Sequence, residues 1–224
     1  MEFSGILRQI IISAPAILIA IVFHELAHGW VAYKLGDNTA KLSGRLTLNP
    51  LSHIDPFGTI IMPFMLLILT NGQWVFGYAK PVPVNPYNFK NPKGGMAVCA
   101  AAGPVANLIM AVVCTIIIKW IVFPLSGIIP QFIFAPLILS LKATIIINIV
   151  LASFNLIPIP PLDGGRILTG VLPLKYSQIM EKIEPFGSLI VIFMIITGFT
   201  TVFVWPLVNF FLNILSLFVG GING

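Results

Sequence analysis

The sequence predicts an all-α polytopic membrane protein with about five to six hydrophobic segments. Hydrophobic residues make up 58% of the chain and charged residues only 8%, whereas soluble domains carry about 25% charged residues. The mean hydropathy is +1.01. The net charge of +5 is not gathered into a basic cluster with interleaved aromatic residues, so it indicates membrane topology and no nucleic-acid partner. We therefore expect residues 1–224 to form a single integral membrane domain in contact with the lipid bilayer.

The first third of the chain predicts one spanning helix, one polar segment and one short apolar segment. Residues 6–35 are apolar over a length that crosses a bilayer. The polar residues 37–56 alternate partly over 40–48, which predicts a short membrane-associated β element. Residues 57–70 are apolar but fall short of the roughly 20 residues that a helix needs to cross. We expect this last segment to be re-entrant, returning to the side from which it enters.

Further spans follow a polar, proline-rich loop. They are expected at residues 96–123, 132–157, 186–204 and, over a shorter apolar stretch, 206–219. The C-terminal transmembrane segments thus cover about residues 186–219. Between them and the preceding spans lies a Pro- and Gly-rich break, followed by a polar connector.

The basic residues predict how these segments are oriented. If residues 57–70 return, one side of the membrane holds Lys41, Arg45, Lys80, Lys90, Lys93, Lys175 and Lys182. The turn at 124–130, on the opposite side, has no charge, and Arg8 and Lys119 are the exceptions to the pattern. By the positive-inside rule, the basic side faces the cytoplasm.

The motif HExxH at residues 24–28 lies inside the first apolar run. On a helix, His24 and His28 lie on one face, and their imidazoles can supply two nitrogen ligands to a tetrahedral Zn²⁺. Glu25 can then accept a proton from a metal-bound water. The three residues could instead only pack helices together, but ionisable groups at membrane depth are costly and mark a functional site. The sequence therefore predicts one zinc ion here.

A hydrolytic zinc site needs a third protein ligand and one open position. The candidates are His53, Asp37, Asp55 and Asp163. Asp163 lies in the Pro- and Gly-rich break after a hydrophobic helix, and irregular backbone at membrane depth lines a wet cavity or is packed in protein. Asp163 could instead cap the following helix at 164–172. The turn around His53 and Asp55 explains those two residues without a metal, so the spacing favours Asp163.

Three motifs in this order resemble the site-2 protease family of intramembrane zinc metalloproteases. They are the HExxH, the GPVAN at residues 103–107 and the NLIPIPPLDGG at residues 155–165. The likeness is greatest to the small bacterial and archaeal members, and residues 49–58 and 76–86 also resemble that group. The resemblance covers roughly residues 15–170.

The resemblance implies roles for particular residues. His24, His28 and Asp163 would hold zinc, and Glu25 would be the general base and then the proton donor. Asn155 matches a family residue that holds substrate or steadies the oxyanion.

Asn107 is a weaker match to a site role, since a mid-helix asparagine can equally bond a neighbouring helix. Residues 37–48 resemble a family β element that clamps substrate by edge pairing. The gap at 108–154 has no room for the PDZ domain of better-known members.

The expected function is therefore that of a multi-pass cell-membrane endopeptidase. It would cut peptide bonds in or near transmembrane segments of membrane-protein substrates. Its catalytic core would span about residues 6–172, with a three-helix centre and the active site toward the cytoplasm. The alternative is a non-enzymatic membrane metal-binding protein or zinc permease. A proteolytically silent relative that binds membrane partners is a third reading.

Overall fold

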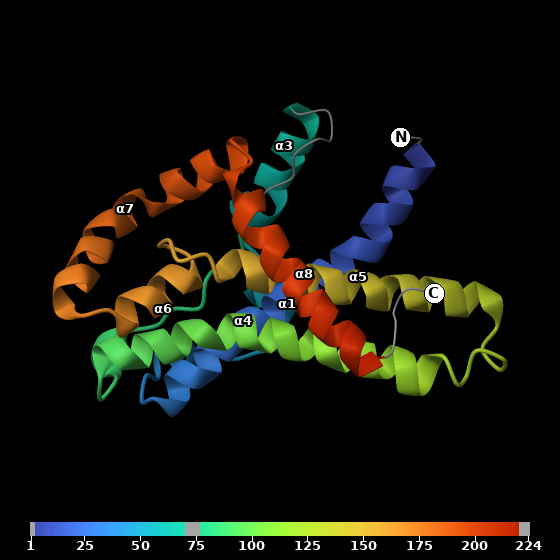
Figure 1. Ribbon diagram of the computed structural model, residues 1–224, viewed down its shortest axis with the longest axis horizontal. Helices are drawn as coiled ribbons and strands as arrows, with labels where there is room; N and C mark the ends of the chain where they lie inside the picture. Colours follow the sequence, from blue (N-terminus) through green and yellow to red (C-terminus); the bar gives the residue numbers. More distant parts are fainter. Residues whose placement is uncertain (1–2, 70–76, 220–224) are drawn as a thin grey trace.

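The protein is a bundle of long helices, described by a computed structural model over residues 3–69 and 77–219 (Figure 1). Its centre consists of α1 (Phe3–Lys34), α4 (Pro92–Ile117) and α5 (Gln131–Asn155), which contact one another pairwise. Helices α4 and α5 run antiparallel along the long axis of the molecule, and η4 (Ile118–Val122) extends α4 toward the turn between them. The sequence predicts spans over the same parts of the chain, at residues 6–35, 96–123 and 132–157.

The remaining helices surround this centre. The short α6 (Asp163–Val171) packs on α4, α7 (Leu174–Ile196) follows it, and α8 (Phe199–Val219) lies against α5. Ile145 and Ile149 of α5 pack with Val208 of α8 in a hydrophobic cluster that also includes Ala111 of α4. Apolar burial therefore joins α8 to the two antiparallel helices.

Four helices in the described part are long and apolar enough to cross a membrane, which supports a multi-pass membrane protein. They comprise residues Ile11–Lys34, Pro92–Val122, Gln131–Asn155 and Phe199–Leu217. The first three match the predicted spans closely. The fourth does not match the predicted boundaries.

The predicted span over 186–204 is wrong as a continuous helix. The polar connector that was expected before residue 186 is the first part of α7. This helix ends at Ile196, and the helical path is interrupted at Gly198, whose φ of 73° lies in the left-handed region. Pro206, where the prediction placed a break, lies inside α8. A uniformly apolar run has no periodicity that marks its ends, and membrane helices tolerate proline because neighbouring groups satisfy the freed carbonyl.

The predicted β element over 40–48 is also wrong. Residues Thr39–Leu42 form the short helix α2, and the described residues contain no strand. Asp37 starts this turn by accepting a hydrogen bond from the Thr39 backbone N–H at 3.1 Å, and Arg45 N–H closes it onto Ala40 O at 2.9 Å. Four helical residues are too few to show a 3.6-residue period, so partial alternation was misleading.

The apolar segment after residue 56 projects from the bundle, and residues on its two sides lie close together. It comprises η2 (Pro56–Ile61) and α3 (Met62–Leu69), which projects away from the long helices in Figure 1. Tyr78 N–H donates to Gly58 O at 3.0 Å, and Lys80 N–H donates to His53 O at 3.0 Å. Both ends of the excursion are therefore tied together.

Asp37 joins the end of α1 to the polar, proline-rich loop before α4, here called the second polar loop (residues 77–91). Its side chain is fully buried and accepts hydrogen bonds from Asn85 N–H and Asn88 Nδ2, each at 2.7 Å, as well as from Thr39. Burial by itself raises the pKa of Asp37, but the hydrogen bonds from Thr39, Asn85 and Asn88 outweigh it and hold the pKa below its usual value. The carboxylate form is thus the one that the fold binds.

We predict that Asp37→Asn destabilises the protein at neutral pH, by about 1.5–3 kcal/mol for the lost charge-assisted hydrogen bonds. The contribution of Asp37 is full above the unfolded pKa near 4 and is lost as the pH falls through the lower folded pKa. Thermal unfolding in detergent should therefore show a gap between wild type and variant that narrows below about pH 4. A gap that widens on acidification would contradict this account.

Candidate metal centre

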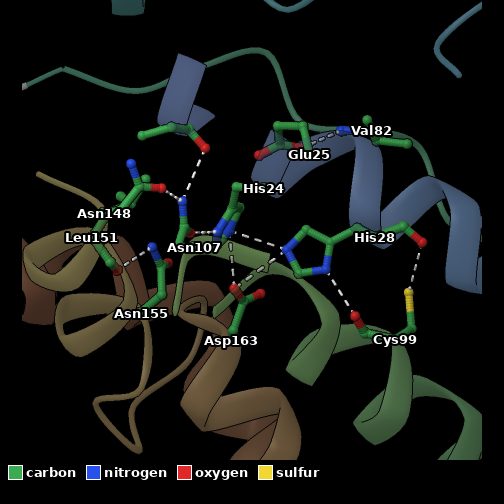
Figure 2. Close-up of polar contacts among 11 residues, drawn as sticks. His24, Glu25, His28, Val82, Cys99, Asn107, Asn148, Leu151, Asn155 and Asp163 are labelled. Atoms are coloured by element: carbon green, nitrogen blue, oxygen red, sulfur yellow. Dashed lines mark hydrogen bonds and ion pairs between the residues drawn. The ribbon is translucent and has the colours of Figure 1, made fainter. Parts of the chain in front are cut away.

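Three side-chain atoms converge at the contact between α1 and the start of α6 (Figure 2). His24 Nε2 and His28 Nε2 are 3.1 Å apart, and Asp163 Oδ2 lies 3.1 Å from the first and 3.3 Å from the second. All three side chains are buried or nearly so. The helix brings the two histidines together because they are one turn apart.

Asp163 reaches this place because the chain folds back tightly after α5. It is the first residue of α6, and the N-cap position is taken by Leu162. A Cβ on Gly164 or Gly165 would overlap the backbone of residues 156–160, so the two glycines permit the close return. The tight connection between α5 and α6 thus places Asp163 beside the histidines.

Hydrogen bonds on the far side of each ring define the tautomers. His28 Nδ1 is 2.8 Å from Cys99 O, which can only accept. His24 Nδ1 is 2.6 Å from Asn107 Oδ1, and the Asn107 Nδ2 group donates elsewhere, to Ala20 O at 3.0 Å and Asn148 Oδ1 at 2.8 Å. Both Nδ1 atoms therefore carry the proton in the neutral rings, which leaves a lone pair on each Nε2.

Three electron-pair donors thus face one another, and Asp163 Oδ2 is a buried atom without a hydrogen-bond partner. A cation between them would satisfy all three. In a tetrahedral site with zinc–ligand distances of about 2.0–2.1 Å, neighbouring ligand atoms lie about 3.3 Å apart, close to the separations seen here. Two imidazole nitrogens and one carboxylate oxygen are also a typical ligand set of hydrolytic zinc. The residues fit the ion.

One face of helix α4 packs against the two histidine rings of this centre. Cys99, Gly103 and Asn107 follow one another at intervals of four residues and therefore share one face. A Cβ on Gly103 would come within 2.7 Å of His24 Nε2 and would also overlap the His28 ring. Only glycine leaves room for both imidazoles.

A pocket of about 370 Å³ opens beside the centre and is lined by His24 and Glu25. Asn155 lies in its wall, and its Nδ2 group donates to Leu151 O at 3.0 Å within the same helix. Glu25 Oε2 accepts a hydrogen bond from Val82 N–H at 2.8 Å. The pocket therefore contains a carboxylate, an amide and one of the histidines.

The other predicted ligand candidates lie elsewhere. His53 is buried and its Nε2 contacts Thr47 O at 2.9 Å, Asp55 accepts from Gly58 N–H at 2.6 Å, and Asp37 holds the second polar loop. Among the described residues, His24, His28 and Asp163 form the only group that could hold a metal ion.

Asn107 lies away from the pocket. It is fully buried, and all its polar atoms are engaged with α1 and α5. Sequence reasoning missed Cys99, Asn148 and Val82. The polar Asn148 inside an apolar span was the one detectable signal, whereas Cys99 and Val82 act through backbone groups that any residue offers.

Because the centre depends on the absence of a side chain at position 103, we predict that Gly103→Ala lowers zinc affinity by at least tenfold. The added Cβ must push one imidazole away from Asp163. Gly127→Ala is the control, since a Cβ there meets nothing within 4 Å. Competition with a chromogenic chelator measures both variants, and equal zinc affinity for Gly103→Ala and wild type would contradict the geometry.

Comparison with known proteins agrees with this centre. The model of Peptidase family M50 matches residues 12–135 and 124–198 of the chain. YwhC of Bacillus subtilis is 39% identical over 200 residues, which cover 86% of this chain and 84% of YwhC. Zinc metalloprotease MJ0392 of Methanocaldococcus jannaschii is 28% identical over 205 residues, covering 91% of this chain and 45% of MJ0392.

Rip2 of Mycolicibacterium smegmatis is 26% identical over 196 residues, covering 88% of this chain and 71% of Rip2. No solved structure matches the chain. The family match extends over most of the chain and includes the HExxH helix and Asp163. The chain therefore belongs to peptidase family M50, the site-2 protease family of zinc metalloproteases.

Proposed function

We propose that this protein is an intramembrane zinc metalloendopeptidase that hydrolyses peptide bonds in or near transmembrane segments of membrane-protein substrates. His24, His28 and Asp163 hold the zinc, and Glu25 is the general base. The observation that carries the proposal is the triangle of three acceptor atoms, with both histidine tautomers fixed, beside a pocket that contains Glu25.

The catalytic part consists of α1, α4, α5 and α6, within about residues 6–172. Its three long helices have the length and composition of membrane spans, and His24 and His28 lie inside the first of them. A substrate helix arriving through the bilayer would meet the pocket at the depth of these histidines. Its carbonyls are shielded by its own hydrogen bonds, so it must unwind locally before it can react.

When bound, zinc lowers the pKa of a coordinated water toward about 7 and polarises the scissile carbonyl. Glu25 accepts a proton from the attacking water and returns it to the leaving amine nitrogen. The Asn155 amide shares one hydrogen with Leu151 O and has another to offer to the substrate carbonyl oxygen. Asn107 does not contact the substrate; it accepts a hydrogen bond from His24 Nδ1 and so holds this histidine in its metal-binding tautomer.

The excursion through α3 forms part of the pocket wall. Met62 and Tyr78 line the pocket, and Phe64, Met65 and Ile68 are exposed apolar side chains. We propose that this segment dips into the bilayer and returns, with the exposed side chains in lipid. The polar loops at its base then lie on the cytoplasmic side together with most of the basic residues, and so does the active site.

A metal permease is not favoured. Transport would need successive ligand groups along a path, whereas the described residues form one such group. The carboxylate between the histidines also has no role in simple transport. Zinc uptake into vesicles that Glu25→Gln leaves unchanged would instead support the permease.

We predict that Glu25→Gln retains one zinc per chain but abolishes cleavage, because the amide cannot accept the proton. His24→Ala and Asp163→Ala should lose both zinc and cleavage. The assay uses protein in phospholipid vesicles with a panel of single-span test helices that carry helix-destabilising residues, and mass spectrometry detects the products. Cleavage by Glu25→Gln at the wild-type rate would remove Glu25 as the base, and full zinc in Asp163→Ala would remove the third ligand.

A second prediction separates the two asparagines. Asn107→Leu should lower zinc affinity by about 10- to 100-fold, as is typical when the hydrogen-bond partner of a ligating histidine is removed. Asn155→Leu should retain zinc and lose cleavage, because this side chain lies in the pocket and contacts neither histidine. The reverse pattern, measured by chelator competition and the same cleavage assay, would exchange the two roles.

A further inference from the structure

The carboxylate of Glu25 is held by a backbone group from a distant segment. Val82 N–H donates to Glu25 Oε2 at 2.8 Å, and Val82 is 7% exposed (Figure 2). Val82 stands between Pro81 and Pro83, which have no N–H. It therefore supplies the one amide hydrogen of this Pro-Val-Pro stretch, and that hydrogen points at Glu25.

The same stretch is pinned from its other side by Arg45. Arg45 Nη2 donates to Lys80 O at 2.6 Å and to Pro81 O at 3.3 Å. Arg45 is 7% exposed, its Nε is buried without a partner, and no carboxylate pairs with it among the described residues. A buried guanidinium is usually paired with an acid. Here the guanidinium instead donates hydrogen bonds to two successive backbone carbonyls that precede Val82.

We infer that Arg45 is a positioning residue for Glu25, and that it acts through the Val82 N–H. This inference rests on the proposed role of Glu25 as the base. Arg45 holds residues 80–81, the two prolines restrict the backbone on both sides, and the Val82 amide then fixes one carboxylate oxygen of Glu25. The other oxygen is left for the pocket that Glu25 shares with His24.

The arrangement has a physical advantage over a side-chain donor. A backbone N–H on a braced segment has little freedom to lose when it orients the carboxylate, and a hydrogen bond to an ionised group is stronger than a neutral one. Loss of this bond should lower kcat by about 10- to 100-fold, the range expected for a hydrogen bond to a charged group. Zinc content should not change, because no metal ligand is touched.

The decisive variant is Val82→Pro, which removes the amide hydrogen. The neighbouring prolines already favour an extended backbone, so a third one fits the segment. Val84→Pro is the matched control, since the Val84 N–H has no acceptor among the described residues. Val82→Pro should lower kcat with zinc content and KM retained, whereas Val84→Pro should stay within about twofold of wild type.

Variants of Arg45 test whether this residue acts through the contact between Val82 N–H and Glu25. Arg45→Lys and Arg45→Ala should both lower kcat, and guanidinium ion added at millimolar concentration should partly restore Arg45→Ala. Combining Arg45→Lys with Val82→Pro should be no worse than Val82→Pro alone, because both changes act on one contact. Additive losses, or losses accompanied by loss of zinc, would mean that Arg45 supports the fold only and would overturn the inference.

Amide hydrogen exchange gives a readout that needs no substrate. The Val82 amide should be protected in the full-length wild type and lose protection in Arg45→Lys and in Glu25→Ala. The Lys80 amide, bonded to His53 O, should stay protected in both. Unchanged Val82 protection in Arg45→Lys would overturn the inference. If zinc and Val82 protection behave as expected but no variant or wild type cleaves any test helix, the proposed protease activity fails and the positioning contact stands.

Discussion

The structure depends on one electrostatic constraint: two imidazole nitrogens and one carboxylate oxygen face one another inside the protein with no hydrogen between them. Such a cluster is costly unless a cation lies at its centre. His24 and His28 are presented by successive turns of one helix, but Asp163 is the first residue of α6, which follows two further spans. The packing of the core therefore brings a third candidate zinc ligand to a helix that already carries two.

Two facing rows of residues on α1 and α4 make this arrangement stable. Each row has a four-residue spacing, which places its members on one helix face. The rows are Ala20, His24 and His28 on α1, and Asn107, Gly103 and Cys99 on α4. Going along the pair, Asn107 bonds both Ala20 and His24, Gly103 makes room for both rings, and Cys99 bonds His28. The contact between the two helices and the orientation of the two histidines thus depend on the same set of interactions.

The polar loops near the C-terminal end of α1 have a corresponding role for Glu25, the proposed base. Asp37 ties the second loop to the end of α1, and Arg45 ties its middle to the turn after α2. Between these two anchors the extended backbone passes Glu25. Loops that look like connections between membrane segments are therefore part of the scaffold of the candidate active site, and their buried charges are used to hold backbone groups.

The local patterns of the sequence by themselves determined the class of the protein, the three central helices and the pairing of His24 with His28, because composition and helical periodicity are properties of neighbouring residues. Sequence reasoning misplaced the break at Gly198 and predicted a β element at 40–48, since a uniformly apolar run and a four-residue helix show no usable period. The sequence also favoured Asp163 as the third ligand candidate over His53, Asp55 and Asp37. The distances between Asp163 and the histidines, and the partners that Asn107, Cys99 and Val82 provide, were decided only by the tertiary structure. Those contacts join segments far apart in the chain, and they exist because the long helices pack in one particular register.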